Sequence, residues 1–172
     1  GQHDQAIAAF RDAIRLDPDF MEPYRGLDLL YYRQKMYVEA LEMAQKAIEL
    51  EPDSPDLHCD LAQDLRKLER YDEALEAANK AIELAPGSAY AHRTLADIHQ
   101  DMSQHEMAAV EYQKALSLDA DGAGAHAGLG DAYAALGRYA EAVKAYEVAA
   151  RLEPEDEEIK TKLAQMRQKV EV

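Results

Sequence analysis

A constant spacing of 34 residues constrains this sequence more than any single motif does. Five tripeptides mark it: "LDP" at 16–18, "LEP" at 50–52, "LAP" at 84–86, "LDA" at 118–120 and "LEP" at 152–154. A fixed period of roughly 20–50 residues is typical of chains built from stacked structural repeats. We therefore expect an array in which each repeat packs mainly against its neighbours.

Each period contains two runs of apolar residues with helical spacing. In residues 123–156, Leu129 and Tyr133 lie four residues apart on one helical face, and a second apolar face begins at Tyr139. The tripeptide "LGR" separates the two runs, and Pro154 ends the second. The pattern predicts two antiparallel helices per repeat. Helices of about three turns are marginal alone in water, so they must stack.

These positions resemble the tetratricopeptide repeat (TPR) family. The segments "YDEALEAANKAIELAP" (71–86) and "YAEAVKAYEVAARLEP" (139–154) carry nearly the whole second-helix pattern. Small residues recur at the packing positions of that helix: Ala40, Ala74, Ala108, Ala142, Ala47, Ala81, Ala115 and Ala149. The resemblance implies an all-α fold, a right-handed superhelical solenoid of antiparallel helix pairs.

The period also predicts how the chain is divided. Complete repeats are expected at 21–54, 55–88, 89–122 and 123–156, after a lone second helix in residues 1–20 and before a C-terminal capping helix in residues 157–172. The apolar face of the N-terminal helix is Ala6, Phe10, Ala13 and Leu16. We expect its missing first helix to reflect truncation from a longer array. The alternative is a surface that pairs with another chain.

A few positions depart from the family pattern. Asp28 stands where a small residue is expected, which predicts looser packing in the first complete repeat. Lys35, Glu69 and Ser103 replace the glycine between the two helices. None of these departures is expected to break the fold.

The stretch "GAGAHAGLG" (122–130) looks like a phosphate-binding loop, but such a loop follows a strand, and no strand pattern precedes it. The period instead places Gly128 and Gly130 inside a helix, with Gly130 in a small-residue packing position. Helix-interior glycines lower stability by roughly 1 kcal/mol each relative to alanine, so this repeat is expected to be more pliable.

The composition and the remaining motifs argue against several functions. A net charge of -15 opposes binding to nucleic acid, and no apolar run is long enough for insertion into a membrane. Cys59 is the single cysteine. The six histidines fall on repeat-signature positions, and three of them, His58, His92 and His126, lie one repeat apart, too far from one another to share a metal. We therefore expect no metal, no cofactor and no catalytic site, so the chain is not predicted to be an enzyme.

In TPR arrays the first helices line a concave groove that holds peptides, and the resemblance carries this groove to specific positions of each repeat. The candidate peptide-binding residues are Arg25, Leu29, Tyr32, Arg33, Arg66, Lys67, Tyr90, Arg93, Asp97, Asp101 and Asp131. We expect a basic half in the first two complete repeats and an acidic half in the last two. Leu29, Tyr32 and Tyr90 have no evident core partner and are expected to be anchors.

The predicted function is a protein-interaction scaffold that binds a peptide or helix in this groove, with the arginines and lysine holding an acidic segment. The clamp with which some relatives bind a terminal carboxylate is absent, because Leu29 and Asp60 stand where it needs asparagine. Two alternatives stay open: homo-oligomerisation through the chain ends, and a recruiting arm of a larger enzyme or of a secretion or polysaccharide-export machine. The compartment is unknown. A cytoplasmic location is favoured and a periplasmic one stays open.

Overall fold

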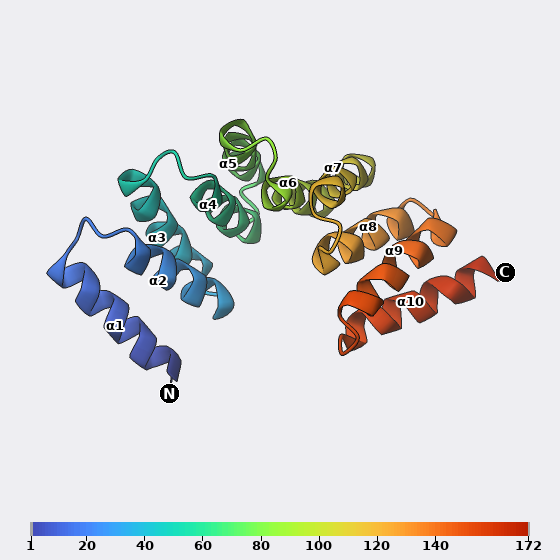
Figure 1. Ribbon diagram of the computed structural model, residues 1–172, viewed down its shortest axis with the longest axis horizontal. Coiled ribbons are helices and arrows are strands. Elements are labelled where there is room, and N and C mark those ends of the chain that lie inside the picture. Colours follow the sequence, from blue (N-terminus) through green and yellow to red (C-terminus); the bar gives the residue numbers. More distant parts are fainter. Residues whose placement is uncertain (1, 172) are drawn as a thin grey trace. The chain divides into compact units, whose positions relative to one another are not determined.

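The computed structural model describes residues 2–171, apart from the side chain of Gln2, and in these residues it contains ten helices and no strands (Figure 1). The helices are α1 (Gln2–Leu16), α2 (Glu22–Arg33), α3 (Tyr37–Leu50), α4 (Pro55–Lys67), α5 (Tyr71–Leu84), α6 (Ala89–Asp101), α7 (His105–Leu118), α8 (Ala123–Ala135), α9 (Tyr139–Leu152) and α10 (Glu157–Val170). The all-α prediction is confirmed over the described residues.

The helices form two compact units, α1–α5 and α6–α10, which we call unit 1 and unit 2. Within each unit, helices that follow one another in the sequence pack together. The first helices of successive repeats also touch, α2 with α4 in unit 1 and α6 with α8 in unit 2. Each unit therefore presents a surface made of two neighbouring first helices.

The turn between the helices of a pair has the same backbone form in every repeat. Lys35, Glu69 and Ser103 have φ angles of 61°, 58° and 59°, close to the 73° of Gly137. In each case the next residue donates its N–H to a carbonyl near the end of the first helix, for example Arg70 to Leu65 at 2.9 Å. This is the left-handed helix ending that glycine usually provides. Three of the four turns form it with residues that have a Cβ.

Small side chains allow the second helices to pack closely. Ala40, Ala74, Ala108 and Ala142 are fully buried, and the family-pattern alanines about two turns later in the same helices are at most 2% exposed. In unit 2 these alanines join Tyr112, Tyr133 and Tyr146 in one core. The residues that carried the family resemblance are thus the residues that make the helix contacts.

The glycines of α8 have a packing role that the sequence analysis identified only at Gly130. A Cβ at Gly128 would lie 2.3 Å from Cζ of Tyr112, and one at Gly130 would lie 2.7 Å from Cε1 of Tyr146. Both glycines therefore make room for a tyrosine ring of a neighbouring second helix. Because alanine would not fit at these two positions, the stability cost relative to alanine does not apply to them, and the greater pliability of this repeat stays a prediction.

The C-terminal helix packs on α9 through Ile159, Leu163 and Met166, whereas Val170, near its end, is half exposed. The side chain of Asp156 caps α10 by accepting the amides of Glu158 and Ile159 at 2.8 and 3.0 Å. At the other end of the chain, Leu16 is 78% exposed, so it does not share the half-buried face of Ala6, Phe10 and Ala13.

Candidate functional site

In unit 1, six of the predicted groove residues lie on the neighbouring helices α2 and α4, and all of them except Arg25 are considered together first. Leu29 is 43% exposed, and Arg33 and Lys67 are exposed at the ends of their helices. No described residue forms a hydrogen bond or an ion pair with either of these two cations. We call this set the basic surface of unit 1: Leu29, Tyr32, Arg33, Arg66 and Lys67.

Arg66 is more constrained than its two neighbours. Its Nε donates to the amide oxygen of Gln63 at 3.0 Å, and its side chain is half buried. It also lies within hydrogen-bonding reach of the Tyr32 hydroxyl. Arg66 therefore helps to shape the surface as well as adding positive charge to it.

Tyr32 does have core partners, contrary to the sequence prediction. Its ring packs against the cluster of Leu27, Tyr31 and Ala40 and meets the ring of Tyr37 edge-on, with 5.5 Å between centroids. Burial raises the pKa of Tyr32, and nearby Arg66 partly counters that effect. Tyr32 is thus a half-buried platform, fixed by its own unit before any ligand binds.

Arg25, predicted to hold acidic side chains of a ligand, is already paired within the chain. Its Nε donates to Oδ2 of Asp60 at 2.9 Å, and its Nη2 lies 3.7 Å from Oδ2 of Asp56. Asp60 is almost fully buried, so this arginine neutralises a carboxylate that has little access to water. Arg25 therefore has a structural role that the sequence analysis did not assign to it.

Behind this pair lies a group of buried carboxylates that the sequence analysis did not anticipate. Asp28 and Asp64 are 2% and 0% exposed, and no described donor reaches Oδ2 of Asp28 or either oxygen of Asp64. Burial, then the charge of Asp60, raises the pKa of Asp28 to about 7; burial, then the charge of Asp28, raises that of Asp64 to about 9. A shared proton would supply the missing donor. The looser packing expected around Asp28 is not found.

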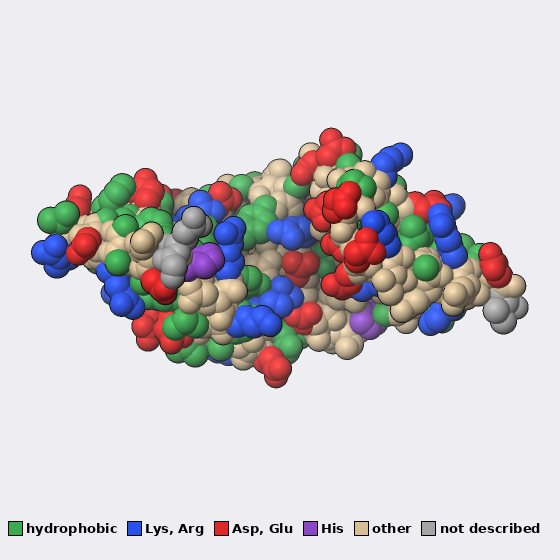
Figure 2. All heavy atoms as spheres, turned by 90° about the horizontal axis from the view of Figure 1, so that it is seen from below, with side chains coloured by type: hydrophobic (Ala, Val, Ile, Leu, Met, Phe, Trp, Pro, Cys, Tyr) green, Lys and Arg blue, Asp and Glu red, His purple; other side chains and the backbone are tan. Residues whose placement is uncertain are grey.

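In unit 2, two of the predicted acidic groove residues accept hydrogen bonds from their own unit. Asp97 accepts the Tyr112 hydroxyl at 2.7 Å, and Asp131 accepts the Tyr146 hydroxyl at 2.7 Å and lies 3.0 Å from Nζ of Lys162. Asp101 is exposed at the end of α6. The predicted acidic half is thus largely occupied by internal contacts. Figure 2 likewise shows Lys and Arg side chains intermixed with Asp and Glu on the face that it draws.

Tyr90 and Arg93 border a pocket of about 190 Å³ in unit 2. The guanidinium carbon of Arg93 lies 5.3 Å from the centroid of the Tyr90 ring, which is within range of a cation–π interaction. The rest of the lining comes from Ala89, Ala115, Asp119, Gly122 and Ala125. Tyr90, predicted to be an anchor without a core partner, is half buried and supports Arg93.

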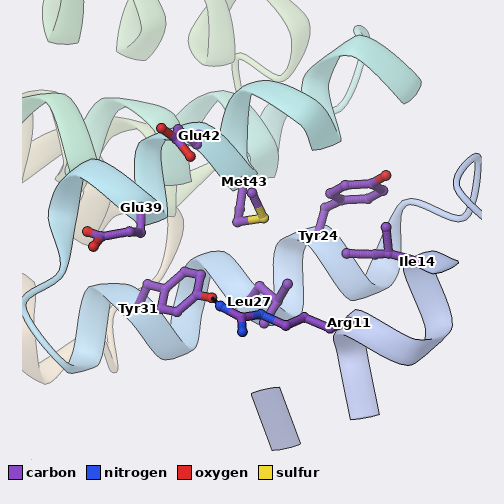
Figure 3. A pocket seen from close by; sticks show the side chains of 8 residues that line it. All are labelled: Arg11, Ile14, Tyr24, Leu27, Tyr31, Glu39, Glu42 and Met43. Carbon is purple, nitrogen blue, oxygen red and sulfur yellow. Dashed lines mark hydrogen bonds between the residues drawn. The ribbon is translucent and has the colours of Figure 1, made fainter. Parts of the chain in front are cut away.

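A second pocket, of about 300 Å³, lies in unit 1 among α1, α2 and α3 (Figure 3). Arg11 donates to the hydroxyl of Tyr31 at 2.8 Å, and Leu27 and Met43 supply apolar lining. Glu39 and Glu42, both on α3, line the edge of this pocket. None of these residues belongs to the predicted groove, and no repeated sequence signal marks them.

The histidines make the local contacts that their repeat positions indicate. Nε2 of His58 lies 2.8 Å from the carbonyl of Pro52, and Nε2 of His126 lies 3.0 Å from that of Ala120. Nδ1 of His92 lies 2.8 Å from a carboxylate oxygen of Glu111. Among the described residues, no cluster of three or more His, Cys, Asp or Glu side chains is arranged to bind a metal. Within residues 2–171 no helix combines the length and the apolar character of a membrane span.

Comparison with known families now adds to this geometry. The family model described as tetratricopeptide repeat matches residues 31–98 and 99–166, and a second model, described as TPR repeat, matches residues 1–35. The chain belongs to the tetratricopeptide repeat family. It is therefore of the class of helical-repeat scaffolds for protein interaction, whose members are generally not enzymes.

Solved structures share the fold. MamA is 26% identical with a TM-score of 0.71, over 88% of this chain and 89% of that one. TTC0263, a thermophilic TPR protein of Thermus thermophilus, is 21% identical with a TM-score of 0.85, over 98% and 92% of the two chains. A chain of the APC/C hetero-tetramer Cut9–Hcn1 is 20% identical with a TM-score of 0.91, over 99% of this chain and 34% of that one. None of the curated proteins compared with the sequence matches it.

Proposed function

We propose that this chain binds an extended peptide segment that carries acidic residues, and that the basic surface of unit 1 is where the segment docks. One observation carries the proposal. Arg33 and Lys67 are exposed cations on adjacent first helices, and no described carboxylate neutralises them although the chain carries a net charge of -15. In so acidic a chain, two such cations on neighbouring helices form a local site for opposite charge.

The apolar members of the surface give such a segment something to pack on. Leu29 is 43% exposed, and the Tyr32 ring is held in place by Tyr37 and the core behind it. Aromatic groups fixed before binding lose little conformational entropy, so they suit an anchor position. The exposed charges around them tune the association rate and the choice of partner more than the affinity itself.

The test is binding of an acidic peptide library to the parent chain and to a variant with Arg33→Glu and Lys67→Glu, at two salt concentrations. The matched control carries Lys46→Glu and Lys80→Glu, which make the same charge change on the second helices α3 and α5 of the same unit. We expect the first variant to bind at least about tenfold more weakly and the control to bind within about threefold of the parent. Binding of the first variant at parental strength would refute the proposal.

Self-association is the competing function that the same samples can reveal. Sedimentation of the parent chain over a range of concentrations measures it directly. If the mass rises with concentration and no peptide binds, the function is self-association through contacts between copies, and peptide binding at the basic surface is refuted.

A further inference from the structure

Two arginines occupy the same position in two repeats but have different surroundings. Arg25 and Arg93 are both the fifth residue of their repeats. The two carboxylates that pair with Arg25, those of Asp56 and Asp60, follow it by 31 and 35 residues. At the same distances after Arg93 the chain has Gly124 and Gly128. Both carboxylates that satisfy the first arginine are therefore replaced by glycine around the second.

The structure places Arg93 beside the space that a side chain at position 124 would fill. Its Nη1 lies 3.5 Å from the position that a Cβ at Gly124 would take. The contact of Arg93 with the described residues is with the face of the Tyr90 ring, at 5.3 Å, and none of their carboxylates lies within ion-pair distance of it. A guanidinium carries five N–H donors, and a ring beneath its face leaves the donors along its edge available.

The fold requires glycine at position 128 but not at position 124. Gly128 must be small because the Tyr112 ring occupies the space beside it. Gly124 is exposed, and a Cβ there would meet Arg93 alone. The fold therefore tolerates a side chain at position 124, and its absence leaves the space next to Nη1 of Arg93 unfilled by the residues around Gly124.

We propose that Arg93 binds the carboxylate of an aspartate or glutamate side chain of a bound peptide, in the space beside Gly124 that corresponds to the place of Asp56 beside Arg25. This rests on the proposed function, since it names a second contact of the same kind of ligand, on unit 2. The charges around Arg93 favour the binding of one carboxylate rather than two. Among the described residues that line the pocket, Arg93 is the one cation, and Asp119 in the same lining disfavours a second acidic group.

The internal comparison also supplies the test variant. Gly124→Asp would place a carboxylate beside Arg93 as Asp56 stands beside Arg25, so it would occupy the site from within the chain. Gly124→Asn has the same shape without the charge and is the matched control. Arg93→Gln removes the cation and provides a second, independent variant.

The probe is the blocked peptide Ac-GEGEGEGEGE-NH2, with Ac-GQGQGQGQGQ-NH2 as its neutral counterpart, followed by NMR of the ¹⁵N-labelled chain. We expect the Glu peptide to shift the Nε–H signal of Arg93. We also expect the affinity measured from that signal to fall at least about tenfold in Gly124→Asp and to change less than about threefold in Gly124→Asn. In Arg93→Gln the shifts of the neighbouring Gly124 and Ala125 amides should disappear. Equal binding by Gly124→Asp and Gly124→Asn would overturn the inference.

A third peptide distinguishes a side-chain carboxylate from a chain terminus. If the Gln peptide with a free C-terminus shifts Arg93 as strongly as the Glu peptide does, the assignment to an acidic side chain is wrong.

The variant with Arg33→Glu and Lys67→Glu separates this inference from the proposed function. Shifts at α2 and α4 without shifts at Arg93 would refute the inference and leave the basic surface intact. Shifts at Arg93 that the unit 1 variant leaves unchanged, without shifts at α2 and α4, would refute the basic surface and support the site on unit 2.

Discussion

The hydroxyl of Tyr112 on α7 donates a hydrogen bond to the carboxylate of Asp97 on α6, at 2.7 Å. One repeat later, Tyr146 on α9 donates to Asp131 on α8, also at 2.7 Å. The tyrosine lies 15 residues after the aspartate in both pairs. These two aspartates, both assigned to the groove from the sequence, are thus tied to the second helix of their own repeat.

The hydrogen bond between Tyr112 and Asp97 predicts that replacing Asp97 lowers the stability of the fold, although the sequence assigned this residue to the groove. Asp97→Ala leaves the Tyr112 hydroxyl, on a ring that is 2% exposed, without this acceptor. We expect it to lower the free energy of unfolding by about 1–3 kcal/mol, and Tyr112→Phe to lower it by about 1 kcal/mol. Urea unfolding followed by circular dichroism measures both. Glu106→Ala, on an exposed side chain of α7, should change it by less than about 0.5 kcal/mol.

The buried carboxylates of unit 1 predict that stability falls as the pH rises. Asp28 and Asp64 have pKa values of about 7 and about 9 in the folded chain, above the 3.8 of an unperturbed aspartate. The folded chain therefore holds protons that the unfolded chain has lost, and the free energy of unfolding decreases from about pH 4 to about pH 9. The stabilisation by these groups is fully present below pH 4 and is lost once the pH passes the folded values.

Asp64→Asn tests this origin of the pH dependence. An amide cannot ionise and can donate to Asp28, so we expect a flatter dependence and, at pH 9, a variant more stable than the parent by more than about 1 kcal/mol. Unfolding in urea at pH 5, 7 and 9 provides the comparison. Asp72→Asn, on an exposed side chain of α5, should follow the parent curve. A variant at position 64 that also follows the parent curve would show that the carboxyl pair is not responsible.

Periodicity predicted the helices well because a repeat uses the same small residues for the same contacts. The alanines named from the sequence are the buried residues between helices, and the family assignment follows from them. The groove was predicted less completely. Position within a repeat identifies which residues lie on the first helices, but not whether another repeat supplies a partner. Arg25 and Arg93 are equivalent by position, and only the residues at the two downstream positions distinguish them.

The buried acids were missed for a related reason. In the sequence, Asp28 stood out only as a departure from a small residue and Asp60 only as a position where the clamp needs asparagine, and Asp64 did not stand out at all. Their proximity depends on the packing of α2 against α4, which no pattern within one repeat encodes. Asp28 is the eighth residue of its repeat and Asp60 and Asp64 are the sixth and tenth of the next, so a comparison of equivalent positions would not have brought the three together.

The glycines of α8 predict opposite effects for two substitutions that differ by four positions. Gly128→Ala forces its Cβ into the Tyr112 ring, which is also held by its hydrogen bond to Asp97, so we expect a loss of about 1–3 kcal/mol. Gly124→Ala meets only Arg93 at 3.5 Å and gains helix propensity, so we expect a gain of up to about 1 kcal/mol. Thermal unfolding of the two variants would show whether each substitution raises or lowers the stability. A gain from alanine at both positions would mean that the Tyr112 ring can move aside.

The turns between helices predict that glycine is the better residue where the chain lacks it. Lys35, Glu69 and Ser103 adopt positive φ angles, which strain any residue with a Cβ by roughly 1–2 kcal/mol. Part of the gain from removing that strain is offset because glycine also makes the unfolded chain more flexible. We expect Glu69→Gly to raise the free energy of unfolding by about 0.5–1 kcal/mol. Gly137→Ala should lower it by a similar amount, because a Cβ there meets no neighbouring atom and the cost is that of φ alone. Urea unfolding of both variants separates the effect of the backbone angle from that of side-chain packing. If the two substitutions changed the free energy of unfolding in the same direction and by the same amount, the positive φ angle would not be the cause.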